Sequence, residues 1–215
     1  SIGGITFEGR DIIDLDIRLG TISFNNMIPF FREVNKHFGC FNVSRRVCER
    51  ALDSGKNILI VPGGAQESIM AYPGTMNLIL NRRRGFIRLA LKKGVPLVPI
   101  LSFGESDMFN LLEIKQGTLL HKVQRVYQSI FGFTVPLFWG RRLWGVPTVL
   151  PMRKPVHVVV GKPMPVDAFD GDVMSDEGKK AVEALHKKYA ERLQTMYNKH
   201  KHLWKNKDKL GLKIV

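Results

Sequence analysis

A short apolar stretch that runs directly into paired glycines constrains the fold of this chain more than any other feature. Residues 57–61 are mainly apolar and β-branched and lie between Gly55 and a proline, which predicts a buried strand. The segment PGGAQE follows at residues 62–67. In open α/β sheets the carboxyl ends of strands bind ligands, and glycines let a ligand approach backbone N–H groups. Glu67 adds a carboxylate that could orient a base or accept a substrate hydroxyl.

The spacing of this segment alone favours a plainer interpretation, a tight turn in which Gly63 and Gly64 serve backbone geometry only. The segment is not a P-loop, because no Gly-Lys-Ser/Thr sequence follows at the required distance. It therefore predicts a place where a site could lie, and other motifs must supply the chemistry.

Apolar periodicity along the chain predicts an α/β fold, a mixed, partly parallel sheet flanked by helices, in one domain over residues 1–215. Strands are predicted over 20–24, 57–61, 97–101 and 156–160, and helices over 26–38, 44–55, 84–93, 118–130 and 175–200. The middle of the chain has the order of a β-α-β unit with parallel strands. Residues 131–150 are rich in Phe, Trp, Pro and Gly and are not expected to form one regular element. The basic tail, about residues 200–215, is expected to be frayed.

Three arginines, Arg82, Arg83 and Arg84, stand at the start of the predicted helix 84–93. Free N–H groups and the helix dipole favour anions there, and guanidinium groups suit phosphates and carboxylates. The arginines indicate either an anion-binding patch near the glycine segment or a solvated basic turn, and the residues alone leave both open.

The net charge of the chain is +14, from 33 Lys and Arg against 19 Asp and Glu. Such a charge favours nucleic acid, anionic lipid headgroups or a phosphate-bearing ligand such as coenzyme A, and a solvated basic face is the plain alternative. No apolar stretch is long enough to span a membrane, and none resembles a signal peptide. Cys40 and Cys48 fit neither a disulfide framework nor a zinc pattern, so we expect free thiols and no metal site.

Arg141 and Arg142 lie between Phe138-Trp139 and Leu143-Trp144. Aromatic rings next to arginines suit a membrane interface, where the cations contact lipid phosphates. They also suit single-stranded nucleic acid, whose bases stack on rings. A loop held by buried tryptophans is the third interpretation, and the sequence does not separate the three.

The six histidines do not supply an evident general base. None has an Asp or Glu four residues later, and the His-x-x-x-x-Asp pair of glycerolipid acyltransferases is absent, as is a Gly-x-Ser-x-Gly nucleophile elbow. His157 lies in a predicted strand and is interpreted as a structural histidine. No catalytic base can therefore be nominated from these residues.

Four motifs in order give the chain a resemblance to the diacylglycerol acyltransferase family of the second type, which includes monoacylglycerol and wax-ester acyltransferases. They are VPGGAQES (61–68), NRRRGFIRLAL (81–91), LVPILSFGE (97–105) and KPVHVVVGKP (154–163). YPG (72–74) fits between the first two, and GCFNVSR (39–45) resembles the family's stretch before the preceding helix. The likeness extends from about residue 39 to residue 165 and more weakly to the ends.

This resemblance implies a glycerolipid-acyltransferase-like fold and an enzyme that transfers a fatty acyl group from acyl-CoA, as co-substrate, to the hydroxyl of a neutral lipid. Diacylglycerol is the preferred acceptor, followed by monoacylglycerol, sterol and long-chain alcohol. The resemblance implies no metal and no other cofactor, a place at the endoplasmic reticulum membrane and lipid droplets, and allows a homo-oligomer. A catalytically inactive lipid-binding paralogue and a basic nucleic-acid-binding module are the alternatives.

The same resemblance assigns roles to residues only in part. Gly63, Gly64 and Glu67 match the family's glycine-rich motif and would position the reacting groups, with Glu67 in a supporting role. The arginines at 82–84 match its basic stretch, and from their charge we infer that they face acyl-CoA phosphates. The family's His-Pro-His-Gly motif, which supplies the expected base, lies just upstream of the region matching residues 1–4. Because the chain starts at Ser1, we expect a fragment that lacks this motif and the membrane segment before it, and that is inactive alone.

Overall fold

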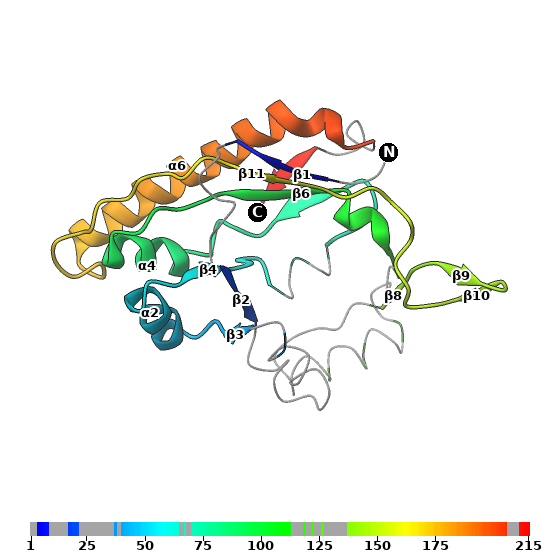
Figure 1. Cartoon of the computed structure of the whole chain (residues 1–215), viewed down its shortest axis with the longest axis horizontal. Coiled ribbons are helices and arrows are strands. Elements are labelled where there is room, and N and C mark those ends of the chain that lie inside the picture. Colours follow the sequence, from blue (N-terminus) through cyan, green and yellow to red (C-terminus); the bar gives the residue numbers. More distant parts are fainter. Residues whose placement is uncertain are drawn as a thin grey trace.

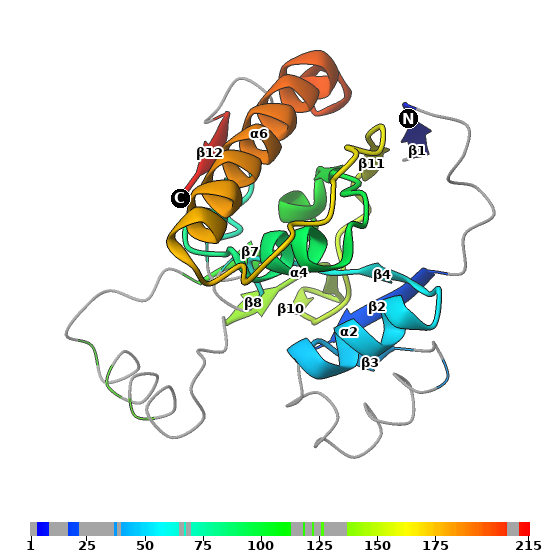
Figure 2. The same ribbon diagram turned by 90° about the vertical axis from the view of Figure 1, so that its left-hand side faces the viewer.

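The computed structural model describes residues 4–8, 17–21, 37, 40–64, 67, 70–112, 118, 122, 126, 137–205 and 211–215, which form an α/β fold (Figures 1 and 2). Its helices are α2 (Arg45–Asp53), α4 (Gly85–Lys93) and α6 (Asp176–His200), with 3-10 helices η2 (Glu105–Met108) and η3 (Lys201–Leu203). Its strands are β1 (Gly4–Phe7), β2 (Ile17–Thr21), β3 (Phe41–Asn42), β4 (Asn57–Leu59), β5 (Met76–Leu78), β6 (Ile100–Phe103), β7 (Asn110–Leu111), β8 (Phe138–Trp139), β9 (Arg142–Leu143), β10 (Val146–Pro147), β11 (His157–Val160) and β12 (Leu212–Ile214).

The strands of the described residues form five small sheets of both kinds, which confirms the predicted mixed, partly parallel α/β class. In one sheet β11 lies between β1, to which it is parallel, and β6, to which it is antiparallel. In a second, β2 pairs in parallel with both β3 and β4. The pair β5–β12 is parallel, and the pairs β7–β8 and β9–β10 are antiparallel.

The predicted β-α-β unit is wrong, because the strands on either side of α4 lie in different sheets. β4 pairs with β2, whereas β6 pairs with β11. After Leu59 the chain leaves the sheet of β2, β3 and β4 and passes through β5, which pairs with β12, before it enters α4. β4 is also shorter than the predicted strand over 57–61, and β6 is displaced toward the C-terminus from the predicted strand over 97–101. Apolar periodicity identifies a strand, but it carries no information about the partner of that strand.

Capping residues and glycines lie at the ends of the helices. Gly94 ends α4 with a φ of 60°, a left-handed conformation that glycine adopts without a steric cost. Ser175 caps α6, and its side chain accepts a 3.0 Å hydrogen bond from the Gly178 N–H. Ser44 precedes α2, and Gly55 follows its last turn. The predicted helices 26–38 and 118–130 and residues 22–24 lie outside the described residues, apart from helical positions at His37, Lys122 and Val126.

The core lies between α6 and the β1–β11–β6 sheet, which the long helix covers in Figure 1. The face of α6 that helical spacing predicts as apolar is the face that is buried, with Val182, Leu193 and Met196 in the core. Phe103 of β6 stacks on Tyr197, with ring centroids 6.0 Å apart. This packing holds β6 and the segment after it in a fixed position relative to the helix.

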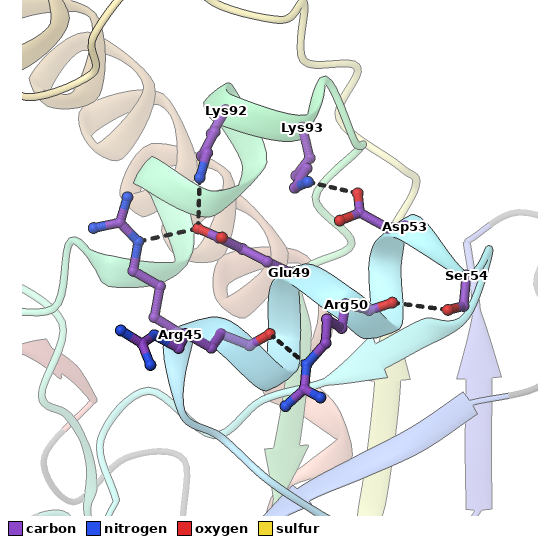
Figure 3. A network of polar contacts seen from close by, with 8 residues as sticks. Arg45, Glu49, Arg50, Asp53, Ser54, Lys92 and Lys93 are labelled. Carbon is purple, nitrogen blue, oxygen red and sulfur yellow. Dashed lines mark hydrogen bonds and ion pairs between the residues drawn. The ribbon is translucent and has the colours of Figure 1, made fainter.

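A network of ion pairs joins α2 to α4 (Figure 3). Glu49 contacts Lys92 at 2.9 Å and Arg45 at 3.0 Å, and Asp53 pairs with Lys93. The hydrogen bonds from Lys92 and Arg45 lower the pKa of Glu49. These solvent-exposed pairs orient two helices at little net gain in stability.

The expectation of a frayed tail is wrong. Trp204 is buried, with 3% of its surface exposed, and β12 pairs with β5. The Val215 carbonyl accepts hydrogen bonds from the N–H groups of Leu80 at 2.9 Å and Asn81 at 3.0 Å. The composition of the tail is basic and suggests a solvated segment, but an unpaired edge of β5 is available to it in the folded chain.

Cys40 and Cys48 are free thiols, half-buried and buried, as the sequence predicts. Burial raises the pKa of the Cys48 thiol. In the part of the chain that the structure describes, no helix is both long and apolar enough to cross a membrane.

Candidate functional site

A cavity of about 600 Å³ opens beside the glycine segment. Its walls come from the chain after β4, from β5 and β6, from η2 and β7, and from the middle of α6. Most of the lining is apolar, and it includes Leu59, Ile60, Val61, Met76, Leu78, Leu80, Ile100, Leu101, Met108, Phe109, Leu111, Phe138 and Leu193. Cavities of this size and character hold small organic ligands in many proteins.

The glycine segment and Glu67 form one wall of this cavity, so the structure brings Gly63, Gly64 and Glu67 together as the sequence predicts. The Gly64 carbonyl accepts a 3.1 Å hydrogen bond from the Glu67 N–H, and Gly64 has a φ of 56°. A Cβ at residue 63 would lie 1.9 Å from the Glu67 Oε2 atom. Gly63 is therefore required because the Glu67 carboxylate occupies the space of its side chain.

The pKa of the Glu67 carboxyl group is raised above its ordinary value. Burial raises the pKa of Glu67, and the charge of Glu105 adds to this effect. A backbone hydrogen bond from Ile79 and the charge of Arg83 act in the opposite direction and do not cancel it. Glu67 and Glu105 both line the cavity, so two carboxyl groups face one apolar space. A carboxyl group of raised pKa in such a space can exchange a proton or accept a hydroxyl hydrogen bond.

The three predicted arginines occupy three different environments. Arg83 reaches the glycine segment, and its Nη2 donates a 3.4 Å hydrogen bond to the Gly63 carbonyl. Arg84 forms a bidentate pair with Glu183 on α6, at 2.9 and 3.1 Å from Nη2, and also donates to the Asn81 carbonyl. Arg82 is exposed. A role of these residues in binding phosphates stays a prediction, and Arg84 already holds the loop before α4 against α6.

The sequence does not identify several polar residues that the fold adds to the cavity. Ser102, Ser106 and Tyr189 line it together with Glu105. Burial raises the pKa of Tyr189 to about 12, so its hydroxyl stays protonated. Helical spacing assigns Tyr189 only to the apolar face of the helix over 175–200, because period 3.6 marks the face and not what that face meets.

None of the histidines that the structure describes lines the cavity. His186 is buried, and its Nε2 lies 3.0 Å from the Leu80 carbonyl. His200 contacts Glu8, and His157 lies in β11 opposite Phe103. His157 thus occupies a strand position, as its structural interpretation predicts.

The family model for diacylglycerol acyltransferase matches residues 5–214. The chain belongs to the diacylglycerol acyltransferase family. No solved structure matches it.

Three proteins have sequences similar to the chain, with the following identity and coverage. Diacylglycerol O-acyltransferase 2 of Dictyostelium discoideum is 37% identical over 203 residues, which are 93% of this chain and 60% of that protein. Diacylglycerol O-acyltransferase 2B of Umbelopsis ramanniana is 40% identical over 188 residues, 86% of this chain and 53% of that protein. The 2-acylglycerol O-acyltransferase 1 of Bos taurus is 38% identical over 177 residues, 80% of this chain and 51% of that protein. The chain thus spans only about half to three fifths of the length of these relatives.

In this member of the diacylglycerol acyltransferase family, every described residue of the cavity lies within the matched range. The four motifs that carry the resemblance are spread over residues 61–163, and two of them, at 61–68 and 97–105, contribute to the cavity wall. The family match and the cavity therefore direct attention to the same part of the molecule.

Proposed function

We propose that this chain forms the substrate-binding part of an acyl-CoA-dependent O-acyltransferase that converts diacylglycerol to triacylglycerol. The observation that supports the proposal most directly is the apolar cavity of about 600 Å³ with Glu67 and the Gly63-Gly64 backbone in its wall. An apolar space suits a fatty acyl chain or a neutral lipid, and the few polar groups at its wall suit the oxygen atoms of the ester. The names of the relatives agree with this substrate class.

The proposed reaction is direct attack of the acceptor hydroxyl oxygen on the thioester carbonyl carbon. A C–O bond forms, the C–S bond breaks, and the hydroxyl proton passes through a base to the leaving thiolate of coenzyme A. Negative charge develops on the carbonyl oxygen, and backbone N–H groups such as those of Gly63 and Gly64 are suited to stabilise it. The proposal includes no metal and no cofactor besides acyl-CoA.

Glu67 has a positioning role in this proposal. Its carboxyl group, with a raised pKa, would accept a hydrogen bond from the acceptor hydroxyl or orient the base that removes the proton. The base itself is the histidine of the motif that the family carries upstream of the region matching residues 1–4. The site of action is the endoplasmic reticulum membrane and the surface of lipid droplets.

Arg82 and Arg83 are proposed to contact the phosphates of acyl-CoA. Arg82 is exposed, and Arg83 lies against the glycine segment, so an anion placed between them would lie near the cavity. Arg82→Gln should raise KM for acyl-CoA severalfold with little change in kcat, because the phosphates lie away from the reacting carbonyl. Lys187→Gln, an exposed site on α6, is the matched control and should leave KM unchanged.

The deciding experiment is an acyltransferase assay in microsomes with labelled oleoyl-CoA. The chain is expressed with any sequence that precedes Ser1 in its gene and is offered diacylglycerol, monoacylglycerol, sterol and long-chain alcohol. Triacylglycerol as the main product, lost in Glu67→Gln and retained in Glu183→Gln, would support the proposal. Binding of oleoyl-CoA without turnover on any acceptor would overturn it in favour of an inactive lipid-binding paralogue.

A further inference from the structure

The hairpin formed by β9 and β10 has an unusual turn. Leu143 pairs with Val146, so Trp144 and Gly145 form a two-residue turn, with φ values of 51° and 83°. Two positive φ angles are the pattern of a type I′ turn, in which Asn-Gly and Gly-Gly are preferred because a side chain is strained there. Among the described residues, Trp144 alone of the non-glycine residues has a positive φ. A bulky aromatic at this position is a steric cost without a local benefit, which points to a role outside the fold.

The Trp144 side chain makes almost no contact with the rest of the chain, since 98% of its surface is exposed. It lies at the tip of a hairpin that projects from the body of the molecule (Figure 1). Val146 and Val149 behind it are 63% and 72% exposed, and Leu137, Phe138 and Leu150 at the base are each more than 40% exposed. An apolar cluster of this kind on a projecting element marks a binding surface.

The charges around this cluster all have one sign. Arg141, Arg142, Arg153 and Lys154 lie on the hairpin and on the segment that leaves it, and no Asp or Glu occurs between residues 137 and 166. Exposed tryptophan next to arginine and lysine is the composition of a membrane interface, where rings lie at the depth of the headgroups and cations contact lipid phosphates. The aliphatic side chains of Val146 and Val149 cannot stack on bases, which disfavours single-stranded nucleic acid.

The hairpin is joined firmly to the wall of the cavity. The Gly140 and Arg141 N–H groups donate 2.7 Å hydrogen bonds to the carbonyls of Thr148 and Leu150, respectively. The Met152 N–H donates a 2.8 Å bond to the carbonyl of Met108, the last residue of η2. Immediately before the hairpin, the Phe138 ring meets Phe109 edge to face at 5.0 Å. Phe109 and Phe138 both line the cavity, so the hairpin and the cavity share one structural unit.

We propose that the hairpin 140–150 is a membrane-docking element that places Trp144, Val146 and Val149 in the headgroup region of an anionic lipid surface. The exposed cations Arg142, Arg153 and Lys154 would contact lipid phosphates. Docking would bring the Phe109–Phe138 wall of the cavity next to the bilayer, where a neutral lipid resides. That last consequence rests on the proposed function. The docking itself does not, because it depends only on the exposed surface.

The test is binding of the whole 215-residue chain to vesicles by flotation. Vesicles of phosphatidylcholine are compared with vesicles that also contain phosphatidylserine, at low and high salt, and a single-stranded oligonucleotide is titrated in parallel. Trp144→Asn removes the ring and supplies the residue that a type I′ turn prefers, so the hairpin stays intact. Arg142→Gln removes one cation. Two substitutions serve as matched controls. Ile5→Thr changes an apolar side chain on β1 that is 65% exposed, and Arg46→Gln removes an exposed cation on α2.

We expect binding to vesicles that contain phosphatidylserine, weakened by salt, roughly tenfold weaker for Trp144→Asn and roughly fivefold weaker for Arg142→Gln. The controls should bind like the wild-type chain. Equal vesicle binding by all variants would overturn the proposal, as would oligonucleotide binding that depends on Trp144 in the absence of vesicle binding. Because the assay involves no acyl transfer, vesicle binding together with failure of the acyltransferase assay on the longer protein would contradict the proposed function and leave the docking element in place.

Discussion

The indole Nε1 of Trp204 donates a 2.8 Å hydrogen bond to Oδ2 of Asp107, and both residues are buried. The other carboxylate oxygen of Asp107 accepts a 2.8 Å hydrogen bond from the Gly74 N–H. One carboxylate thus joins the tail after α6 to η2 and to the turn before β5. η2 and the strand β5 that follows this turn both supply walls of the cavity. The Asp107 contacts therefore help to hold the cavity in shape.

Trp204→Phe should lower the free energy of unfolding by about 1.5–3 kcal/mol, because it removes the donor to a buried carboxylate and keeps most of the ring. Urea denaturation measures the change. Trp144→Phe, at the exposed hairpin tip, is the control and should change stability by less than about 0.5 kcal/mol. Equal effects of the two substitutions would show that the Asp107 hydrogen bond is not important for stability.

Gly63→Ala should reduce acyl transfer by about tenfold or more, because the new methyl group takes the place of the Glu67 carboxylate. It should also cost about 1–3 kcal/mol of stability through overpacking. The double variant Gly63→Ala/Glu67→Ala removes the two shortest contacts and leaves the residue 67 Cβ at 2.8 Å, so it should recover part of that stability. Additive losses in the double variant would contradict a direct contact between the two residues.

Glu67→Gln should be more stable than the wild-type chain at neutral pH and less active. The raised pKa of Glu67 means that the folded protein binds the carboxyl proton more tightly than the unfolded chain. Wild-type stability therefore falls as the pH rises from the unfolded pKa of about 4.3 through the folded value. Glutamine does not ionise, so its advantage should grow over that window and then stay constant. Chemical denaturation at a series of pH values, with kcat measured in parallel, tests this combination, and a variant less stable at every pH would refute it.

The stability that Glu8 contributes should be lost at acid pH, the opposite of the pH dependence expected for Glu67. Burial acts to raise the pKa of Glu8, but hydrogen bonds from Lys199 and His200 and the charges of Lys199 and Arg192 outweigh it, so the pKa is lowered. The stability contributed by this carboxylate is present above its unfolded pKa and is lost as the pH falls through the lower folded value. Glu8→Gln should cost about 1 kcal/mol or more at neutral pH. In thermal melts, that difference should shrink at acid pH, and a difference independent of pH would refute it.

Trp144→Asn should raise the free energy of unfolding by about 0.5–1 kcal/mol, because asparagine tolerates the left-handed backbone of the turn better than tryptophan does. Trp144→Phe keeps a bulky side chain at the same φ and should give no gain. Thermal unfolding of the two variants measures the difference. A loss of stability in Trp144→Asn would show that the ring packs against the folded chain.

Local signals in the sequence determined the ends of three helices and the position of the glycine segment. Ser175, Gly94 and Gly55 act within a turn of the residues they cap, so the ends of α6, α4 and α2 could be predicted from neighbouring residues alone. Paired glycines after an apolar strand likewise predict a segment whose backbone a ligand can approach. Gly63, Gly64 and Glu67 line the cavity together because only a few residues separate them.

Only the tertiary structure decided the contacts between distant segments. The pairing of β5 with β12 and the separate sheets of β4 and β6 depend on edges created by the rest of the fold. Tyr189 lies in the same cavity wall as Glu67 although more than a hundred residues of chain separate them. Arg84 reaches Glu183 on α6, and Trp144 is exposed rather than buried. Residue type and spacing describe what a segment can bury or bind. Which partner it meets depends on packing free energies summed over the whole chain, which no local pattern contains.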